Sequence, residues 1–202
     1  MKNIGFFGGT FDPIHIGHIN LAMQLFDEGS LDEIIICPNF LSPCKTDLPP
    51  EASAQDRYNM CMLAVKDIPY FSVLDLEIKE KKVHYTIDTL SILQKMFPEN
   101  KFRLLLSIDD LFHFKEWKEY EKIISIAPPL IGHRSGFFLK MIKNLPQDLQ
   151  EKFQNSFIKT DAMEVSSTKI RQRLKNQKYC GHLLSKDVFS YIMEKNLYGC
   201  KK

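Results

Sequence analysis

A glycine pair between a strand pattern and a helix pattern opens this chain and limits what it can fold into. Ile4 to Phe7 form a continuous apolar run, as expected of a short buried strand. Gly8 and Gly9 come next, and residues 19–26 then repeat apolar side chains at helical spacing. Backbone N–H groups beside glycines can approach a phosphate without a Cβ in the way, and a helix start adds the positive end of its dipole. The opening therefore predicts a strand, a phosphate-binding loop and a helix that begins around Pro13 to His15.

The loop also holds two histidines at a spacing that suits phosphoryl chemistry. His15 and His18 are three residues apart, so on a helix start they face the same side. Two imidazoles beside backbone donors can stabilise the negative charge of a phosphoryl group in transfer. Gly17, between them, is predicted to leave room for a ligand against the helix. Singly, these features mark a turn, a helix cap or an ordinary histidine, but together in one loop they favour a phosphate site.

Composition bounds the class of protein. The chain has 202 residues, 44% of them hydrophobic and 26% charged, which is ordinary for a globular domain. The formal charge of +2 does not indicate a nucleic-acid groove, and no apolar run is long enough to indicate a membrane span. The first residues show no signal-peptide pattern. Five scattered cysteines without a Cys-x-x-Cys pair favour free thiols in a reducing cytoplasm over disulfides or a metal site.

Strand patterns alternate with helix patterns along the rest of the chain. This alternation predicts an α/β fold with a doubly wound, mostly parallel sheet. We expect a single domain over residues 1–202, in which residues from about 160 to 202 form a helical subdomain packed on the rest. The predicted strands are Ile4–Phe7, Glu33–Cys37, Phe71–Ile78, Phe102–Ile108, Pro129–Ile131 and Phe157–Asp161. The predicted helices are Ala54–Val65 (with Tyr58, Met62 and Val65 on one face), a helix ending at Phe97, residues 166–175 and residues 183–197.

A proline-rich stretch, Phe40 to Glu51, separates two of these elements. Its lack of periodicity predicts a loop, and long loops in compact domains are usually functional or mobile. Lys45 in this loop is a candidate phosphate contact, although a solvated loop lysine is an equally good interpretation.

Three further features each allow a functional and a structural interpretation. Asp109 and Asp110 follow the most apolar strand, where a carboxylate can hold a ribose or cap the next helix. Trp117, the only tryptophan, is either a core anchor or a stacking platform for a flat ring. Ser166 to Thr168 open a basic helix that includes Arg171, which offers either a second anion site or a well-capped surface helix.

With these motifs in view, the chain resembles the HxGH nucleotidyltransferase superfamily and, within it, the bacterial nicotinate mononucleotide adenylyltransferases. Gly8 to His18 match the first signature of the superfamily, and Ser166 to Arg171 match its Ser-x-Thr-x-x-Arg signature. The resemblance covers nearly the whole chain and implies a Rossmann-like nucleotidyltransferase fold. The narrower resemblance lies in Pro38-Asn39, Tyr85-Thr86, Asp109, Trp117, Arg134 before Ser-Gly-Phe, Val165 to Thr168, and the tail Glu194 to Tyr198.

The resemblance implies an enzyme that transfers AMP from ATP to nicotinate mononucleotide, giving deamido-NAD and pyrophosphate in NAD biosynthesis, with Mg²⁺ carried by ATP. It leaves open whether the protein is a monomer or a homodimer. The implied catalytic residues are Thr10, His15, His18 and Arg171. The implied ATP-binding residues are Gly8, Gly9, Phe11, Lys45, Asp109, Ser166, Ser167 and Thr168. The implied mononucleotide-binding residues are Asn39, Thr86, Trp117 and Arg134.

Three positions depart from the pattern that the resemblance implies. Cys44 stands where the family often has histidine, Lys118 where it often has tyrosine, and Ser107 where it often has glycine. A lysine beside the stacking tryptophan either favours the acid over the amide of the pyridine ring or points to solvent.

Two alternative functions are compatible with the same motifs. One is a transferase with another acceptor, such as phosphopantetheine, and the other is a non-catalytic nucleotide-binding module.

Overall fold

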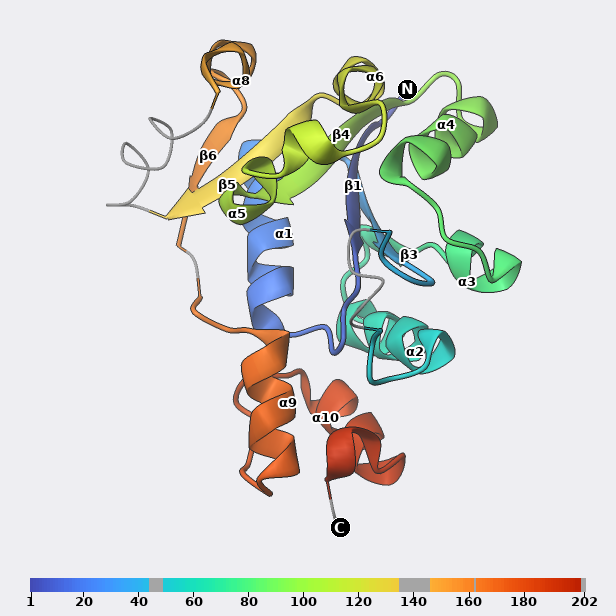
Figure 1. Ribbon diagram of the computed structural model, residues 1–202, viewed down its shortest axis with the longest axis vertical. Helices are drawn as coiled ribbons and strands as arrows, with labels where there is room; N and C mark the ends of the chain where they lie inside the picture. Colours follow the sequence, from blue (N-terminus) through green and yellow to red (C-terminus); the bar gives the residue numbers. More distant parts are fainter. Residues whose placement is uncertain (44–48, 135–145, 162, 201–202) are drawn as a thin grey trace. The chain divides into compact units, whose positions relative to one another are not determined.

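The computed structural model describes residues 1–43, 49–134, 146–161 and 163–200 (Figure 1). Strands and helices alternate along these ranges, as the sequence predicts. The strands are β1 (Asn3–Gly9), β2 (Glu33–Pro38), β3 (Phe71–Val73), β4 (Lys101–Ser107), β5 (Pro129–Arg134) and β6 (Phe157–Thr160). The α-helices are α1 (Ile16–Glu28), α2 (Ala54–Val65), α3 (Leu76–Glu80), α4 (Thr86–Met96), α5 (Ile108–Leu111), α6 (Tyr120–Ile126), α8 (Gln147–Lys152), α9 (Ser167–Lys175) and α10 (Lys186–Glu194). Two 3₁₀ turns are η1 (Phe114–Glu116) and η2 (Leu197–Gly199).

The described strands form one six-stranded parallel sheet in the order β3-β2-β1-β4-β5-β6. Asn3 of β1 lies opposite Lys101 of β4, and Leu104 of β4 lies opposite Pro129 of β5. The order runs outward from β1 to β3 and then returns to β4, so the sheet is wound in two directions. The predicted α/β fold with a doubly wound parallel sheet is confirmed.

Two compact units share the chain. The first unit comprises Met1–Phe7, Leu21–Ile35 and Tyr85–Ala162. The second unit comprises Gly8–Asn20, Ile36–His84 and Met163–Lys202. The expectation of one domain with a helical C-terminal subdomain stays a prediction.

The core of the first unit is a nearly continuous apolar layer of strand residues covered by helices. Leu104, Leu105 and Leu106 follow one another in β4 and are all buried. Consecutive residues of a strand point to opposite faces, so such a run fits only a strand covered on both sides. Helix α4 buries Ile87, Leu90 and Leu93 and packs against α6.

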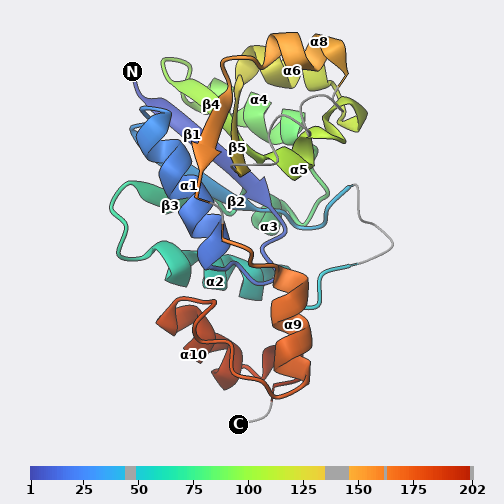
Figure 2. The same cartoon turned by 90° about the vertical axis from the view of Figure 1, so that its left-hand side faces the viewer.

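In the second unit, three helices and a short strand enclose a separate core (Figure 2). Helix α10 lies next to α9 and α2, and α2 packs against β3. Ser185 caps α10 by accepting a hydrogen bond from the Val188 N–H at 3.4 Å. The buried apolar side chains of these helices are Met60, Cys61, Val65, Ile170, Leu174, Val188 and Ile192.

The predicted strand over Phe71–Ile78 is wrong beyond Val73. Strand β3 ends there, and α3 begins at Leu76. Helix α3 buries two successive residues, Glu77 and Ile78, which a half-buried strand would point to opposite faces. The Glu77 carboxylate is buried because it accepts a hydrogen bond from the Phe40 N–H at 3.3 Å, a partner distant in sequence.

Tyr58, Met62 and Val65 share one face of α2 as predicted, since all three line one hollow, but that face is only partly buried. Met62 is 44% exposed, whereas Arg57 is 1% exposed and shares the buried face with Met60 and Cys61. A pattern of apolar residues assigns an arginine to solvent, and here its hydrogen bonds override that assignment. The buried residues of α2 are therefore Arg57, Met60, Cys61 and Val65.

Candidate active site

The loop after β1 is shaped by two glycines. A Cβ on Gly9 would lie 2.8 Å from the ring of Phe11, which is buried beneath the loop with φ at 50°. A Cβ on Gly17 would lie 3.1 Å from His15 Nδ1 and 3.3 Å from Val165 Cβ. Protein atoms therefore fill the space beside Gly17, and the prediction of room for a ligand there is wrong. Helix α1 begins at Ile16, just after the predicted start.

His15 and His18 form a stacked pair held by reciprocal hydrogen bonds. Their ring centroids are 3.6 Å apart, with 16° between the planes. The His15 N–H donates to His18 Nδ1 at 3.2 Å, and the His18 N–H donates to His15 Nδ1 at 3.3 Å. A nitrogen that accepts a hydrogen bond carries no proton, so each neutral ring carries its proton on Nε2. Both imidazoles are thereby fixed as Nε2–H donors.

The pKa shifts of the pair agree with this neutral form. Burial lowers the pKa of His15 to about 4, against 6.5 for an ordinary histidine. Burial, and then the charge of His15, lower the pKa of His18 well below its ordinary value. At neutral pH the pair therefore offers directed N–H dipoles rather than two positive charges.

Asn39 and Arg57 both donate hydrogen bonds to Thr10. The Asn39 side chain donates to Thr10 Oγ1 at 3.3 Å, and its backbone N–H donates to the carbonyl of Gly9 at 2.9 Å. Arg57 Nη1 donates to the Thr10 carbonyl at 2.6 Å, and Nη2 donates to the Phe40 carbonyl at 2.8 Å. The Asn39 amide, implied as a mononucleotide contact, therefore also fixes the hydroxyl of Thr10.

Asp12 joins the loop to two remote segments. Its buried carboxylate accepts hydrogen bonds from the backbone N–H groups of Glu51 at 2.9 Å and Ala52 at 3.1 Å. It also accepts one from the hydroxyl of Tyr198 in η2 at 2.8 Å. A buried carboxylate needs such donors to offset the loss of hydration. Asp12 thus fixes the shape of the loop.

Helix α9 brings the second predicted anion site to the same loop. Ser166 is its N-cap residue, and the N–H groups of its first turn have no partner within the helix. The Ser167 hydroxyl donates to the Pro13 carbonyl at 2.9 Å. Arg171 Nη1 donates to the Asp12 carbonyl at 2.7 Å, and its Nη2 lies 3.5 Å from Thr168 Oγ1. The two signatures, far apart in sequence, are therefore in direct contact within the second unit.

In the first unit, the structure separates the roles of Asp109 and Asp110. The Asp110 carboxylate accepts from the Ser107 N–H at 3.1 Å and from the Ser107 hydroxyl at 2.6 Å. Ser107 is the N-cap of α5, and Asp110 is the N3 residue that completes the capping box; glycine at position 107 would lack the hydroxyl. Asp109 is exposed at the carboxyl end of β4, which leaves its carboxylate available to a ligand.

Trp117 follows η1 and is half-buried. The side chain that anchors η1 is Phe114, which is fully buried, and its ring centroid lies 5.3 Å from that of Trp117. Since Phe114 fills the core, the structural interpretation of Trp117 as the core anchor loses its main support.

Thr86 and Lys118 both lie at the N-terminus of α4. Thr86 is the first residue of that helix, and the Asp88 carboxylate accepts from the Tyr85 N–H at 3.2 Å. Lys118 Nζ lies 3.2 Å from the Asp88 carboxylate and 4.7 Å from the centroid of the Tyr85 ring. Lys118, which stands where the family often has tyrosine, therefore forms an ion pair with Asp88 in the first turn of α4.

The structure says little about two of the predicted site residues, Lys45 and Arg134. Lys45 and its neighbour Cys44 lie outside the described residues. Arg134 is the last residue of β5 and pairs with Thr160 of β6.

Comparisons with known proteins agree with the two signatures. A cytidylyltransferase-like family model matches residues 6–173. A probable nicotinate-nucleotide adenylyltransferase from Dehalococcoides mccartyi is 38% identical over 204 residues, covering 98% of this chain and 97% of the relative. The chain belongs to the nicotinate-nucleotide adenylyltransferase family. The resemblance inferred from the motifs is confirmed.

One further relative and one solved structure are also similar to this chain. The probable enzyme of Carboxydothermus hydrogenoformans is 32% identical over 197 residues, covering 96% of this chain and 97% of the relative. The nicotinic acid mononucleotide adenylyltransferase of Plasmodium falciparum, solved in complex with NaAD, aligns with a TM-score of 0.78 at 21% identity. That alignment covers 100% of this chain and 99% of the other, and it shows a shared fold.

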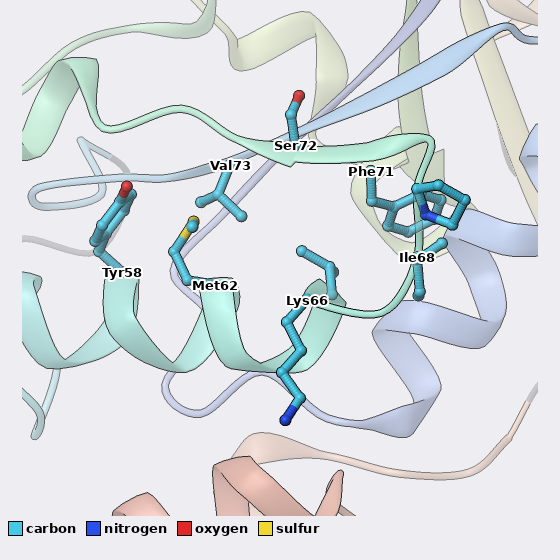
Figure 3. Close-up of a pocket in the computed structure, with 9 residues that line it drawn as sticks. Tyr58, Met62, Lys66, Ile68, Phe71, Ser72 and Val73 are labelled. Carbon is cyan, nitrogen blue, oxygen red and sulfur yellow. The ribbon is translucent and has the colours of Figure 1, made fainter.

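A separate hollow of about 450 Å³ lies in the second unit, between α2 and the segment that leads into β3 (Figure 3). Tyr58 and Met62 line it from α2, and Phe71 and Val73 line it from β3. None of the residues implied by the family resemblance lines this hollow as far as the described chain shows. The face of α2 predicted from the sequence, with Tyr58, Met62 and Val65, therefore contributes to this hollow.

The described ranges contain neither a metal-binding cluster nor a membrane-spanning helix. No group of three or more His, Cys, Asp or Glu side chains in these ranges could hold a metal ion. None of the described helices has the length and apolar character needed to cross a membrane. The four cysteines in these ranges, Cys37, Cys61, Cys180 and Cys200, are free and buried, as predicted for thiols.

Sequence reasoning missed three residues that hold the site together: Arg57, Glu51 and Tyr198. The position of Arg57 gave one usable signal, since it lies three and four residues before Met60 and Cys61 on a helix. A charged residue in line with an apolar stripe indicates a buried hydrogen-bonding role. For Glu51 the pattern offered no such signal; Tyr198 belongs to the tail that matches the family, but its role was not indicated because its partner is remote in sequence.

Proposed function

We propose that this chain transfers the adenylyl group of ATP to nicotinate mononucleotide, with deamido-NAD and pyrophosphate as products. Relatives that are 31–38% identical over nearly the whole chain are named as probable enzymes of this activity. The observation that carries the mechanism is the neutral pair His15–His18, whose Nδ1 atoms are both occupied. Both rings therefore carry their proton on Nε2, at the loop that precedes α1.

In the proposed reaction an oxygen of the mononucleotide 5′-phosphate attacks the α-phosphorus of ATP in line. A P–O bond forms to that oxygen, the bond to the β-phosphate bridge breaks, and pyrophosphate leaves with the electron pair. A phosphate monoester is mostly a dianion at pH 7, so the attack needs no general base. Neutral histidines suit this chemistry because their task is to donate hydrogen bonds to the charge that develops, not to accept a proton.

We assign roles in the second unit according to the chemistry of each residue and the family resemblance. His15 and His18 stabilise the α-phosphate through Nε2–H, and the backbone of Gly8 and Gly9 and the Thr10 hydroxyl orient it. Phe11 supports His18 through an edge contact with ring centroids 5.2 Å apart. The phosphates that leave are gripped by groups of the α9 segment and the long loop: Ser166, the Ser167 N–H, Thr168, Arg171 and Lys45. The Ser167 hydroxyl is assigned to the loop instead, because it already donates to Pro13.

For residues of the first unit we propose the roles that the family resemblance implies. Asp109 holds the ribose of ATP, and its carboxylate suits this because Asp110 completes the capping box of α5. Trp117 stacks on the pyridine ring, and Thr86 and Arg134 bind the mononucleotide. In the second unit, Asn39 combines a mononucleotide contact with its support of Thr10.

Mg²⁺, when bound, neutralises charge on the ATP phosphates. We propose that phosphates and water hold it, since hard cations with octahedral geometry usually keep several waters. The Asp12 carboxylate is an unsuitable ligand because three donors already occupy it.

We also propose that the protein is located in the cytoplasm, in keeping with its free thiols.

The test is pyrophosphate release with ATP and Mg²⁺, comparing nicotinate mononucleotide with nicotinamide mononucleotide. We expect rapid release with the acid and slow release with the amide. Equal rates with both would remove the substrate assignment and keep the reaction class. No release with either acceptor would overturn the proposed function, and an acceptor panel that includes phosphopantetheine would then follow.

A further inference from the structure

Glu51, at the end of the long loop, holds two cations of α9. Its carboxylate accepts a hydrogen bond from Arg171 Nε at 3.1 Å. Lys175, one helical turn further along, lies 3.0 Å from Oε1 and 2.9 Å from Oε2 of the same carboxylate. Glu51 is one of the residues that neither motif includes, although it contacts a signature arginine directly.

The contacts of Arg171 are divided between the two edges of its guanidinium. An arginine has five N–H donors. Nε donates to Glu51, one Nη1–H to the Asp12 carbonyl, and one Nη2–H points to Thr168. Within the described part of the chain, two N–H groups on the Nη atoms keep no protein acceptor. The side chain is 20% exposed, so those two groups can reach a ligand.

The backbone of Glu51 is itself fixed. Its N–H and that of Ala52 donate to the Asp12 carboxylate, and the Asp12 carbonyl accepts from Arg171. Asp12, Glu51 and Arg171 therefore form a closed ring of hydrogen bonds, in which each residue restrains the other two. A guanidinium anchored in this way loses little further freedom when it binds an anion.

Charge does not argue against this arrangement. Burial alone would raise the pKa of Glu51, but hydrogen bonds from Lys175 and Arg171 outweigh it, and the pKa is lowered. The carboxylate is therefore ionised at neutral pH. The Asp12 carboxylate also lies 3.8 Å from Arg171 Nη1, so two carboxylates balance the charges of Arg171 and Lys175, and an anion would be held by the directed N–H groups of Arg171 and not by net charge.

We propose that Glu51 is a positioning residue for Arg171: it holds the Nε edge so that the Nη edge is presented to the phosphates that leave as pyrophosphate. This inference rests on the proposed function for its catalytic consequence. Its structural part, the orientation of an anion-binding arginine, is independent of the acceptor substrate.

The experiment compares Glu51→Gln with Glu51→Ala. Glutamine retains an oxygen that can accept from Arg171 Nε, whereas alanine removes it. Two quantities are measured: kcat/KM for ATP in the adenylyl transfer, and the affinity for inorganic pyrophosphate by calorimetry. We expect Glu51→Ala to lower both by about tenfold to thirtyfold, the scale of a misplaced binding group, and Glu51→Gln to stay within about threefold of the wild type.

Two controls locate the effect at Arg171. Lys175→Met removes the other cation on Glu51 and is expected to change pyrophosphate affinity by less than about threefold, as for a partly exposed ion pair. In an Arg171→Ala background, the further change Glu51→Ala should have no effect, since its target is gone.

Three results would overturn the inference. Tighter pyrophosphate binding in both Glu51 variants would show that the carboxylate merely repels the anion. Unchanged kcat/KM and pyrophosphate affinity in a folded Glu51→Ala protein would show that the contact is structural only. Equal losses in the Gln and Ala variants would show that charge, not orientation, matters. Failure of the proposed function would give a different result. The wild-type protein would then show no adenylyl transfer, while Glu51→Ala would still lower the affinity for pyrophosphate.

Discussion

The two units of this chain hold their candidate residues in different ways. In the second unit, Asp12 and Arg171 are tied to segments 39 to 186 residues away in sequence. In the first unit, Asp110 is fixed by a residue three positions away, and Asp109 remains exposed. A group that stabilises charge in a transition state is more effective when its orientation is fixed before the reaction. A group that only binds a ring or a ribose needs less support, and contacts with residues near it in sequence are enough. Under the proposed function, the groups that face the developing charge are those of the second unit.

The largest expected effect comes from His18. Replacing it with alanine removes one Nε2–H donor and the Nδ1 acceptor that holds the His15 N–H. We expect kcat to fall by about two to four orders of magnitude, the scale of losing groups that stabilise charge in a transition state. Steady-state kinetics with ATP and nicotinate mononucleotide measures this, and a variant that keeps near-normal turnover would contradict the role of the pair.

Arg57 tests whether the long-range contacts stabilise the second unit. Arg57→Ala leaves the carbonyls of Thr10 and Phe40 without this donor in a buried position. We expect the free energy of unfolding to fall by about 3 kcal/mol, because unsatisfied buried groups cost about 1–3 kcal/mol each. Urea denaturation measures the change. Lys66→Met, which breaks the exposed ion pair with Asp187, is the matched control and should leave the midpoint nearly unchanged.

Trp117 and Phe114 test the comparison within the first unit. If the indole is a platform, Trp117→Ala raises the KM for the mononucleotide about tenfold, the lower range of base stacking on aromatic rings. Its thermal midpoint should change little. Phe114→Ala, which empties a fully buried position, should instead lower the free energy of unfolding by about 3–5 kcal/mol. The reverse pattern would make Trp117 the core anchor.

The lowered pKa of His15 predicts a pH dependence of stability. The unfolded chain takes up a proton on this residue near pH 6.5, while the folded protein resists until about pH 4. The unfolded state therefore binds more protons between these values, and folding stability falls as the pH falls through that window. The slope is at most about 1.4 kcal/mol per pH unit for this residue. Urea midpoints at pH 7.0, 6.0 and 5.0 should show a shallower loss in His15→Asn than in the wild type, and identical slopes would contradict the assignment.

The sequence was sufficient wherever neighbouring residues determine the structure. The apolar runs of β1, β2 and β4 and the glycine loop could be read directly, and the contact between the two signatures was foreseeable only through the family resemblance. The structure departs from the pattern at Arg57 and Glu77, because both are charged residues buried by partners remote in sequence. Periodicity assigns charge to solvent, so it cannot detect a charged group that a distant carbonyl or N–H satisfies.

The candidate site follows the same division. The spacing of His15 and His18 indicated a phosphate site, whereas Thr168 and Arg171 were assigned through the family resemblance. The geometry that makes the histidines neutral donors depends on two backbone hydrogen bonds that no pattern encodes. The role of Gly17 was wrong for this reason, since only the folded loop shows His15 and Val165 beside it.

The most direct test of this account is the protonation state of the two histidines. Proton-detected ¹⁵N correlation spectra of the imidazoles at pH 7, assigned with His15→Asn and His18→Asn, distinguish the two tautomers and the charged form. We predict that both rings are neutral, with the proton on Nε2 and an unprotonated Nδ1. Two charged imidazolium rings, or protons on Nδ1, would contradict the claim that this loop presents a pair of Nε2–H donors.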